Sequence, residues 1–235
     1  MGSPLPVTIL NGFLGAGKTT LLQNFLVQSR SLSDVRVAVI VYEMSELDVD
    51  GHILDTSEVM SLDDDLLVSI PAGSMSGSEG LERFSDALGQ ISASGATHII
   101  IETSGSTHPW PLLEAIRADT RVRLHGFLSV VDTITLAQDY DLGKAIVPAA
   151  AHNLSVERRG IENLLAEQIM FANQILLSKI DRLSMDDVRA VGEAIHPINH
   201  YAEIMGMKWG TQKLEAVLAL TTYDNQRVET LGTEF

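Results

Sequence analysis

One segment constrains the fold of this chain more than any other: residues 12–20 read GFLGAGKTT. The segment satisfies the spacing G-x-x-x-x-G-K-[ST], whose confirmation is a strand before it and a helix after it. Both are expected, because the apolar run at residues 5–11 is typical of a buried strand and residues 18–30 resemble a helix. The glycines let consecutive backbone N–H groups turn around a phosphate at the positive end of that helix. The segment therefore predicts a phosphate-binding loop.

The residues of this loop have separate expected roles. Lys18 would neutralise the β- and γ-phosphates of a nucleotide, and the Thr19 hydroxyl would ligate Mg²⁺. A glycine-rich turn that carries Lys and Thr by chance would need neither the fixed spacing nor Gly15, so we prefer the functional interpretation. The predicted nucleotide contacts are Gly15, Ala16, Gly17, Lys18, Thr19 and Thr20.

Short apolar runs rich in Val, Ile and Leu alternate with helix-like stretches along the chain. The strand-like runs are residues 5–11, 35–42, 66–70, 98–103, 124–131 and 174–178. The helix-like stretches are residues 18–30, 79–94, 109–118, 155–171 and 185–195. Ser155 and Ser184 are candidate N-caps for the last two. The alternation predicts an α/β fold in three layers, a mainly parallel sheet with helices on both faces, as in P-loop NTPases.

A second phosphate-side motif is expected after the apolar run at residues 98–101. Residues 102–105 read ETSG at the C-terminal end of a predicted strand, where ligands bind in open α/β sheets. Glu102 would hold Mg²⁺ through a water or polarise the attacking water, and the Gly105 N–H would contact the γ-phosphate. Taken alone, Glu102 could be an ordinary carboxylate at the end of a strand. Together with the phosphate-binding loop at residues 12–20, the functional interpretation is favoured. We expect Lys18, Glu102 and Gly105 to be catalytic.

The sequence SKID at residues 178–181 matches the guanine motif [NT]-K-x-D except for serine in first place. The Asp181 carboxylate can accept two hydrogen bonds from the ring N–H and amino group of guanine, which adenine cannot supply. Lys179 would lie along the base, and Ser178 completes the motif. Charged residues often follow strands, so it is the order of the three motifs that favours GTP over ATP.

These motifs, with EMSELDVDG at residues 43–51, resemble the nucleotide-binding domain of the CobW-like family. The family comprises P-loop GTPases implicated in metal insertion, relatives of the urease and hydrogenase maturation GTPases, and includes nitrile hydratase activators. The resemblance implies a nucleotide- and metal-sensing switch region that contains Glu43, which joins Thr19 and Glu102 as an expected metal ligand. A solvated acidic loop is the alternative interpretation. The resemblance covers residues 5–220 and predicts a GTPase domain at 1–222 with a polar tail at 223–235.

The cysteines of the family's metal motif are missing from this sequence. The G-C-x-C-C pattern is expected at residues 73–77, which read GSMSG. Serine hydroxyls do not replace soft thiolates, so the sequence argues against a thiolate site for zinc, cobalt or copper. His196 and His200 have the spacing of metal ligands, but Pro197 interrupts a helix between them, so we interpret them as two unrelated histidines.

Charge and composition exclude several partners. The formal net charge of −15 repels polyphosphate backbones, so nucleic acid is not an expected partner. The sequence has no cysteine, which excludes a disulfide framework. No stretch has the length and character of a signal peptide or a membrane span, so we expect a cytoplasmic protein with no membrane partner.

The motifs predict a Mg²⁺-dependent GTP-binding protein with slow hydrolysis. Ser106 follows Gly105 in place of a water-orienting glutamine, and no arginine can be assigned as a finger. By resemblance the protein would be a switch in the assembly or metal loading of a client metalloprotein and would form a homodimer. The alternatives are a catalytically weak nucleotide-binding interaction module and a transition-metal carrier.

Overall fold

The computed structural model describes residues 3–43, 66–71, 78–146, 161–220, 223, 224 and 226. Seven strands in these residues form one sheet in the order β3-β2-β4-β1-β5-β6-β7, and every neighbouring pair is parallel. The strands are β1 (Leu5–Gly12), β2 (Val37–Glu43), β3 (Leu66–Pro71), β4 (His98–Glu102), β5 (Val122–Asp132), β6 (Gln174–Ser178) and β7 (Glu203–Gly206).

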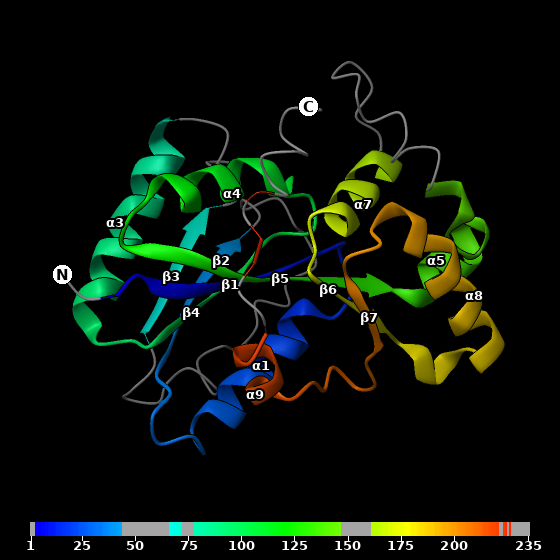
Figure 1. The fold of residues 1–235 in the computed structure, drawn as a ribbon, viewed down its shortest axis with the longest axis horizontal. Helices are drawn as coiled ribbons and strands as arrows, with labels where there is room; N and C mark the ends of the chain where they lie inside the picture. Colours follow the sequence, from blue (N-terminus) through cyan, green and yellow to red (C-terminus); the bar gives the residue numbers. More distant parts are fainter. Residues whose placement is uncertain are drawn as a thin grey trace.

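Helices cover both faces of the sheet, so the predicted three-layer α/β fold is confirmed (Figure 1). The α-helices are α1 (Lys18–Ser29), α3 (Ser78–Ser94), α4 (Pro109–Ala118), α5 (Thr133–Asp139), α7 (Ile161–Met170), α8 (Met185–Ile195) and α9 (Leu214–Leu218). The 3₁₀ helices are η2 (Asp141–Ile146), η3 (Ile180–Arg182) and η4 (His196–Ile198). Helices α1 and α9 pack on one face, and α3, α4, α5, α7 and α8 pack on the other.

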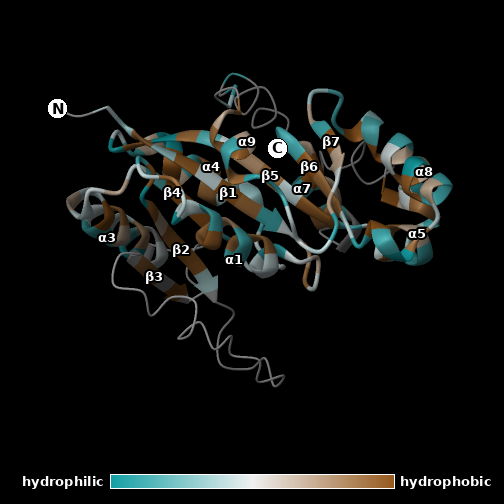
Figure 2. Cartoon of the chain, turned by 90° about the horizontal axis from the view of Figure 1, so that it is seen from below, coloured by the Kyte–Doolittle hydropathy of each residue, from teal (hydrophilic) through white to brown (hydrophobic). Residues whose placement is uncertain are grey.

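Alternation along the central strand explains why two cores form. Val7 and Ile9 of β1 point into the larger core under α3, α4 and α7, whereas Leu10 points into the core under α1 and α9. Parallel strands that are covered on both faces are continuously apolar, and the strands in Figure 2 are mostly brown for this reason. The six strands that the sequence predicts are all present.

Three short elements escape prediction from the sequence. Strand β7 has four residues of which two are exposed, because it is an edge strand. Helices α5 and α9 have seven and five residues, too few for a helical period to be recognised. The predicted capping of α8 is confirmed, since the Ser184 hydroxyl accepts from the backbone N–H of Asp187 at 3.1 Å. The predicted cap at Ser155 lies outside the described residues.

The predicted boundary of the polar tail is wrong by at least one residue. Tyr223 is buried in the larger core, and its hydroxyl donates to the carbonyl of Phe171 at 2.6 Å. Its backbone N–H also donates to the carbonyl of His125 on β5. An aromatic ring with a satisfied hydroxyl is well suited to such a place. The part of the tail beyond residue 226 lies outside the described residues.

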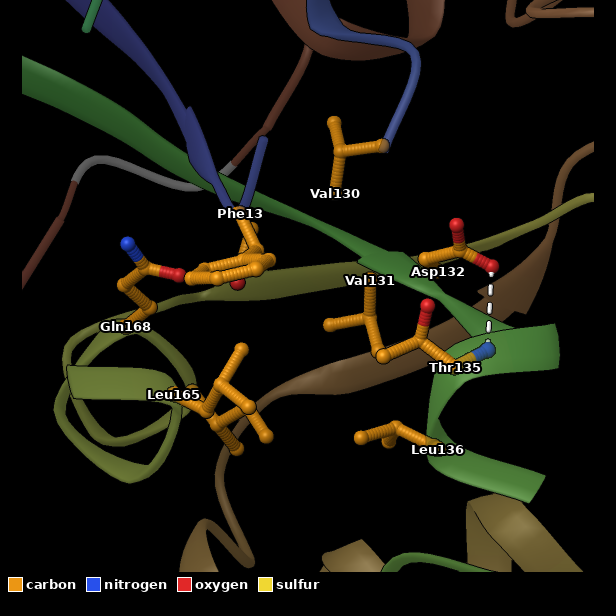
Figure 3. Close-up of a pocket in the computed structure, with 10 residues that line it drawn as sticks. Phe13, Val130, Val131, Asp132, Thr135, Leu136, Leu165 and Gln168 are labelled. Carbon is orange, nitrogen blue, oxygen red and sulfur yellow. Dashed lines mark hydrogen bonds between the residues drawn. The ribbon is translucent and has the colours of Figure 1, made fainter. Parts of the chain in front are cut away.

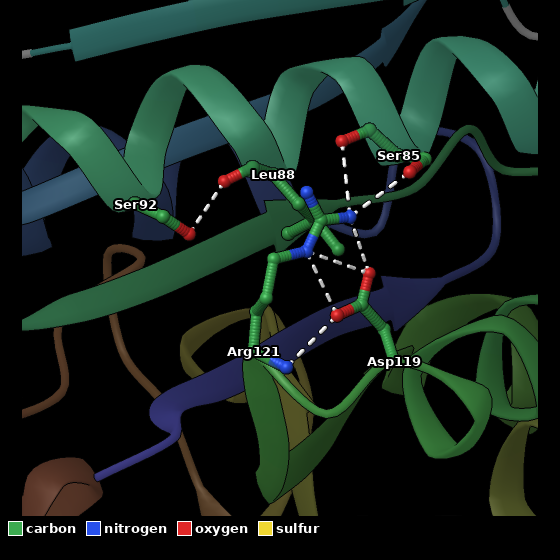
Figure 4. A network of polar contacts seen from close by, with 5 residues as sticks. All are labelled: Ser85, Leu88, Ser92, Asp119 and Arg121. Atoms are coloured by element: carbon green, nitrogen blue, oxygen red, sulfur yellow. Dashed lines mark hydrogen bonds and ion pairs between the residues drawn. The ribbon is translucent and has the colours of Figure 1, made fainter. Parts of the chain in front are cut away.

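A polar network fixes the turn between α4 and β5 (Figure 4). The Arg121 guanidinium donates to both carboxylate oxygens of Asp119 and to the carbonyl and hydroxyl of Ser85 on α3. This network lies where β5 begins, at the N-terminal edge of the sheet. It therefore holds α3 to the sheet at the edge opposite to Gly12 and Glu102.

Candidate functional site

The loop between β1 and α1 has the backbone conformation that its glycines permit. Gly15 has φ 72° and Gly17 has φ 101°, both in the left-handed region that favours glycine. Gly12 has φ 145°, and a Cβ atom there would lie 2.1 Å from the carbonyl oxygen of Val130 on β5. The buried Ala16 closes the turn by donating its N–H to the carbonyl of Phe13 at 3.2 Å. The loop thus requires glycine for both conformation and space.

Lys18 lies folded over this loop at the start of α1. Its Nζ donates to the carbonyl oxygens of Gly12, at 2.7 Å, and Phe13, at 3.1 Å. The side chain is buried, with 7% exposed. Burial lowers the pKa of Lys18 from its usual 10.5 to about 8, although the nearby carboxylate of Glu102 partly opposes that shift. A buried ammonium held by two carbonyls is poised to receive a polyanion.

Thr19 of α1 and Glu102 of β4 meet at the C-terminal edge of the sheet. Strand β4 pairs with β1 so that Glu102 lies beside Leu10, two residues before Gly12. The Thr19 hydroxyl donates to Glu102 Oε1 at 2.5 Å. Burial raises the pKa of the Glu102 carboxyl, and the hydrogen bond from Thr19 and the charge of Lys18 oppose the shift. One hydroxyl and one carboxylate oxygen are hard donors of the kind that Mg²⁺ prefers, so these residues fit that ion.

The turn after Glu102 packs directly against the phosphate-binding loop. A Cβ atom on Gly105 would lie 2.5 Å from the backbone nitrogen of Leu14. No larger residue fits there unless one of the two loops moves. The predicted residues Lys18, Thr19, Glu102 and Gly105 are therefore brought together at the C-terminal edge of the sheet.

Helix α7 holds the same turn from the other side. Gln168 Nε2 donates to the carbonyl of Gly105 at 3.3 Å, and His108 Nδ1 lies 2.6 Å from Glu167 Oε2. Gln168 also lines a small pocket beside Phe13 of the phosphate-binding loop (Figure 3). Two consecutive residues of α7 thus contact the turn at residues 105–108.

The SKID residues lie at the end of β6, two strands from β1. Lys179 has φ 57°, which is uncommon for a residue other than glycine. Its ammonium forms an ion pair with Asp132 at the end of β5. The Ser178 hydroxyl donates to the carbonyl of Val131 at 3.1 Å, and Asp181 is exposed. The three motifs therefore share one edge of the sheet.

A sequence profile of the family described as "CobW/HypB/UreG, nucleotide-binding domain" matches residues 6–206. The chain belongs to this family. Its matched region contains all three motifs, and the resemblance inferred from their residues is confirmed. Members of this family are P-loop GTPases, and the position of the three motifs at the C-terminal edge of the sheet agrees with that family-level description.

Curated relatives of this CobW/HypB/UreG-family chain carry metal-related names. A zinc-regulated GTPase metalloprotein activator 1 from Dictyostelium discoideum is 26% identical over 94% of this chain and 49% of that protein. A zinc chaperone CobW from Sinorhizobium sp. is 30% identical over 81% of this chain and 55% of that protein. The chain thus spans about half the length of the curated relatives it matches.

Solved structures support the fold of the family. The hydrogenase maturation factor HypB from Archaeoglobus fulgidus superposes with a TM-score of 0.56 at 15% identity, covering 99% of this chain and 91% of that one. HypB from Helicobacter pylori in complex with nickel gives 0.53 at 13% identity, covering 98% and 87%. Among the described residues, no helix is long and apolar enough to cross a membrane.

Two features at this edge of the CobW/HypB/UreG-family domain are not predicted from the sequence. Asp132 holds Lys179 and also caps α5, accepting from the N–H groups of Ile134 and Thr135. The signal was a carboxylate directly after a predicted strand. The second element is the loop at residues 207–213, where Trp209 is 74% exposed with φ 57°. No local pattern identifies this loop, because β7 before it is too short to be recognised.

The loop at residues 207–213 is tied by hydrogen bonds to both α1 and β6. Asn24 of α1 donates to the carbonyl of Gly210 at 3.0 Å, and Gln28 donates to that of Gln212 at 2.8 Å. Met207 donates its N–H to Leu177 at the end of β6. Thr20, an expected nucleotide contact, is exposed next to Gly210. The loop therefore borders the same edge as the other motifs.

Some predicted residues cannot be compared with the structure. Glu43 is the last residue of β2, opposite Pro71 of β3, but its side chain lies outside the described part. The rest of the expected switch region at residues 44–51 and the segment at 73–77 also lie outside it. The interpretation of His196 and His200 as unrelated is wrong, since their Nδ1 atoms lie 3.3 Å apart.

Proposed function

We propose that this chain is a Mg²⁺-dependent GTPase domain with slow intrinsic hydrolysis that acts as a switch in the assembly or metal loading of a client protein. The observation that carries the proposal is the contact of Thr19 with Glu102 beside the buried Lys18. Burial lowers the pKa of Lys18 and raises the pKa of Glu102, so the charged form of each residue is disfavoured. A purely structural role does not require such a costly pair.

The phosphates would be held by the loop at residues 12–20. Its backbone N–H groups and the start of α1 provide a site for anions, and the Lys18 ammonium would exchange the carbonyls of Gly12 and Phe13 for phosphate oxygens. Mg²⁺, held by Thr19 and Glu102, would neutralise charge on the β- and γ-phosphates. The Gly105 N–H would contact the γ-phosphate, and Glu102 would orient the attacking water.

Recognition of the base would fall to the SKID turn and its neighbours. The exposed Asp181 carboxylate can accept from both the ring N–H and the amino group of guanine. Asp132 fixes the ammonium of Lys179 and so positions the aliphatic part of that side chain. The exposed ring of Trp209 lies in the loop at residues 207–213, which borders the same edge of the sheet, and it would offer an apolar surface to a base.

The proposed client protein and metal are inferred from the names of the relatives. Those relatives are called zinc chaperones and metalloprotein activators, and the chain spans about half of their length. We therefore include metal loading as the task of the switch, with GTP, GDP and a client metalloprotein as partners. A homodimer is the proposed assembly, and the cytoplasm is the proposed location.

Calorimetry with a panel of nucleotides tests the specificity. With Mg²⁺ present, GTP and GDP should bind at least tenfold more tightly than ATP. The Asp181→Asn variant replaces an acceptor by a donor, so it should lose GTP affinity and gain affinity for XTP, whose base carries a carbonyl at position 2. Asp186→Asn, the same change at an exposed site on α8, should bind like the wild type. Equal affinity for ATP and GTP would refute the proposal.

The alternative is a nucleotide-binding interaction module without catalysis. Ser106 in place of a water-orienting glutamine favours it. Release of phosphate separates the two, since both functions require tight binding of GTP and only the GTPase converts it.

A further inference from the structure

Two exposed histidines are paired where α8 ends. Helix α8 lies beside α5 at one end of the molecule (Figure 1), and the chain continues as His196-Pro197-Ile198-Asn199-His200. The ring centroids of His196 and His200 are 4.9 Å apart, and the two Nδ1 atoms are 3.3 Å apart. Neither residue takes part in the nucleotide site. Their pairing therefore needs an explanation of its own.

The distance between the two nitrogens suits a shared metal ion. Two nitrogens that bind a tetrahedral Zn²⁺ at about 2.0–2.1 Å lie roughly 3.3–3.4 Å from each other. The Nδ1 atoms of His196 and His200 are already at this spacing. Hydrogen bonds from N–H donors are usually shorter, about 2.9–3.0 Å. The observed spacing thus fits chelation better than a hydrogen bond between the rings.

Hydrogen bonds of the Asn199 side chain fix the turn between the two histidines. Asn199 is 2% exposed, and its side chain makes five hydrogen bonds to backbone groups. Its amide donates to carbonyls at the end of α7 and beyond, and its oxygen accepts from the next turn: Ile169, Met170, Ala172, Tyr201 and Ala202. Pro197 restricts the backbone further. A preorganised pair of ligands loses little freedom on binding an ion.

The surrounding charge favours a cation at the pair, and the imidazole nitrogens favour a metal ion of borderline softness. His196 donates its backbone N–H to Gly192 at the C-terminus of α8, the negative end of the helix dipole. The chain as a whole carries a formal charge of −15. Imidazole nitrogens suit Zn²⁺ and Ni²⁺, whereas Mg²⁺ prefers oxygen ligands. Among the described residues no third His, Cys, Asp or Glu joins the pair, which leaves positions for water.

We propose that His196 and His200 form a two-histidine site for a borderline divalent cation such as Zn²⁺ or Ni²⁺, separate from the nucleotide site. It supplies nitrogen ligands in a chain that lacks cysteine.

Calorimetry with ZnCl₂ on the Mg²⁺·GDP-saturated protein tests the site, because the nucleotide site is then occupied. We expect one equivalent of Zn²⁺ to bind, and MgCl₂ in excess not to displace it. His196→Gln and His200→Gln should each weaken this binding at least tenfold without changing the affinity for GDP. Both residues are exposed, and the melting temperature without zinc checks that the fold is intact.

A matched control and a spectroscopic readout complete the test. Asp186→Asn removes one exposed charge from α8 and should leave zinc binding unchanged. In ¹⁵N NMR of the imidazoles, one equivalent of Zn²⁺ should shift the Nδ1 resonances of His196 and His200. Unchanged resonances, an unaltered isotherm in either histidine variant, or equal weakening by Asp186→Asn would each overturn the proposal.

Discussion

Burial acts on titratable residues at both edges of the sheet with different consequences. At the C-terminal edge it shifts the pKa values of Lys18 and Glu102 against their charged forms, and a bound nucleotide would relieve this cost. At the N-terminal edge His98 is buried, where Nε2 lies 2.8 Å from the Thr8 hydroxyl. The ring of His125 meets it edge-on at 5.5 Å. Lys18, Thr19, Glu102 and Gly105 lie at the opposite edge of the sheet, so we assign His98 a role in stability.

We predict that His98 makes the domain sensitive to acid. Burial, together with the charges of His125 and Arg123, lowers the pKa of His98 to about 3. In the unfolded chain His98 takes up a proton near pH 6.5, whereas in the folded chain it stays neutral at that pH. The free energy of unfolding therefore falls as the pH drops below 6.5. Between pH 7.5 and 5.5 this histidine should remove about 1.4 kcal/mol from the free energy of unfolding.

Urea unfolding at the two pH values measures this loss. In His98→Gln the amide can still bond to Thr8, and the part of the pH dependence due to His98 should vanish. Gln28→Leu, which removes no titratable group, should keep the pH dependence of the wild type. The same pH dependence in His98→Gln as in the wild type would contradict the assignment.

At the scale of elements, α7 joins the turn after β4 to the body of the domain. Gln168 is 1% exposed and bonds the Gly105 carbonyl, and Glu167 pairs with His108. The N–H of Gly105 is the group we expect to contact the γ-phosphate. The position of α7 should therefore affect GTP binding more than GDP binding.

We predict that Gln168→Leu weakens binding of a non-hydrolysable GTP analogue about threefold to tenfold, the value of one hydrogen bond, and leaves GDP affinity unchanged. Gln28→Leu is the matched control, because it removes the hydrogen bonds that Gln28 makes to Gln212 and Leu214 and should affect both nucleotides equally. Titration with fluorescent nucleotides gives both affinities. Equal weakening of both nucleotides by Gln168→Leu would mean that Gln168 has only a structural role.

A second prediction at this scale compares two glycines. In Gly105→Ala the new Cβ would lie 2.5 Å from the Leu14 nitrogen, so the two loops must separate and affinity for GTP should fall at least tenfold. In Gly89→Ala, within α3, the new Cβ meets only the flexible Arg121 side chain at 3.5 Å. That variant should gain about 0.5–1 kcal/mol of stability and bind nucleotides normally. Thermal unfolding and GTP titration check both outcomes.

For the whole molecule, the sequence predicts the sheet and the three motifs because both depend on local patterns. Apolar runs indicate buried strands, and the spacing around Lys18 follows the geometry of a phosphate. The contact between Lys179 and Asp132 joins residues 47 positions apart, so no local pattern reveals it. The pairing of His196 with His200 depends on Asn199, whose anchor is the end of α7. These two contacts could not be predicted from the sequence because they depend on tertiary structure.

The most direct test of the GTPase account is a single-turnover measurement of phosphate release from GTP in the presence of Mg²⁺. We predict that the wild type releases one equivalent at roughly 10⁻⁴ to 10⁻² per second, as GTPases without a supplied arginine finger do. Lys18→Ala, which lacks the buried ammonium, should release none. Tight binding of GTP with no phosphate released, or equal release by Lys18→Ala, would contradict the account.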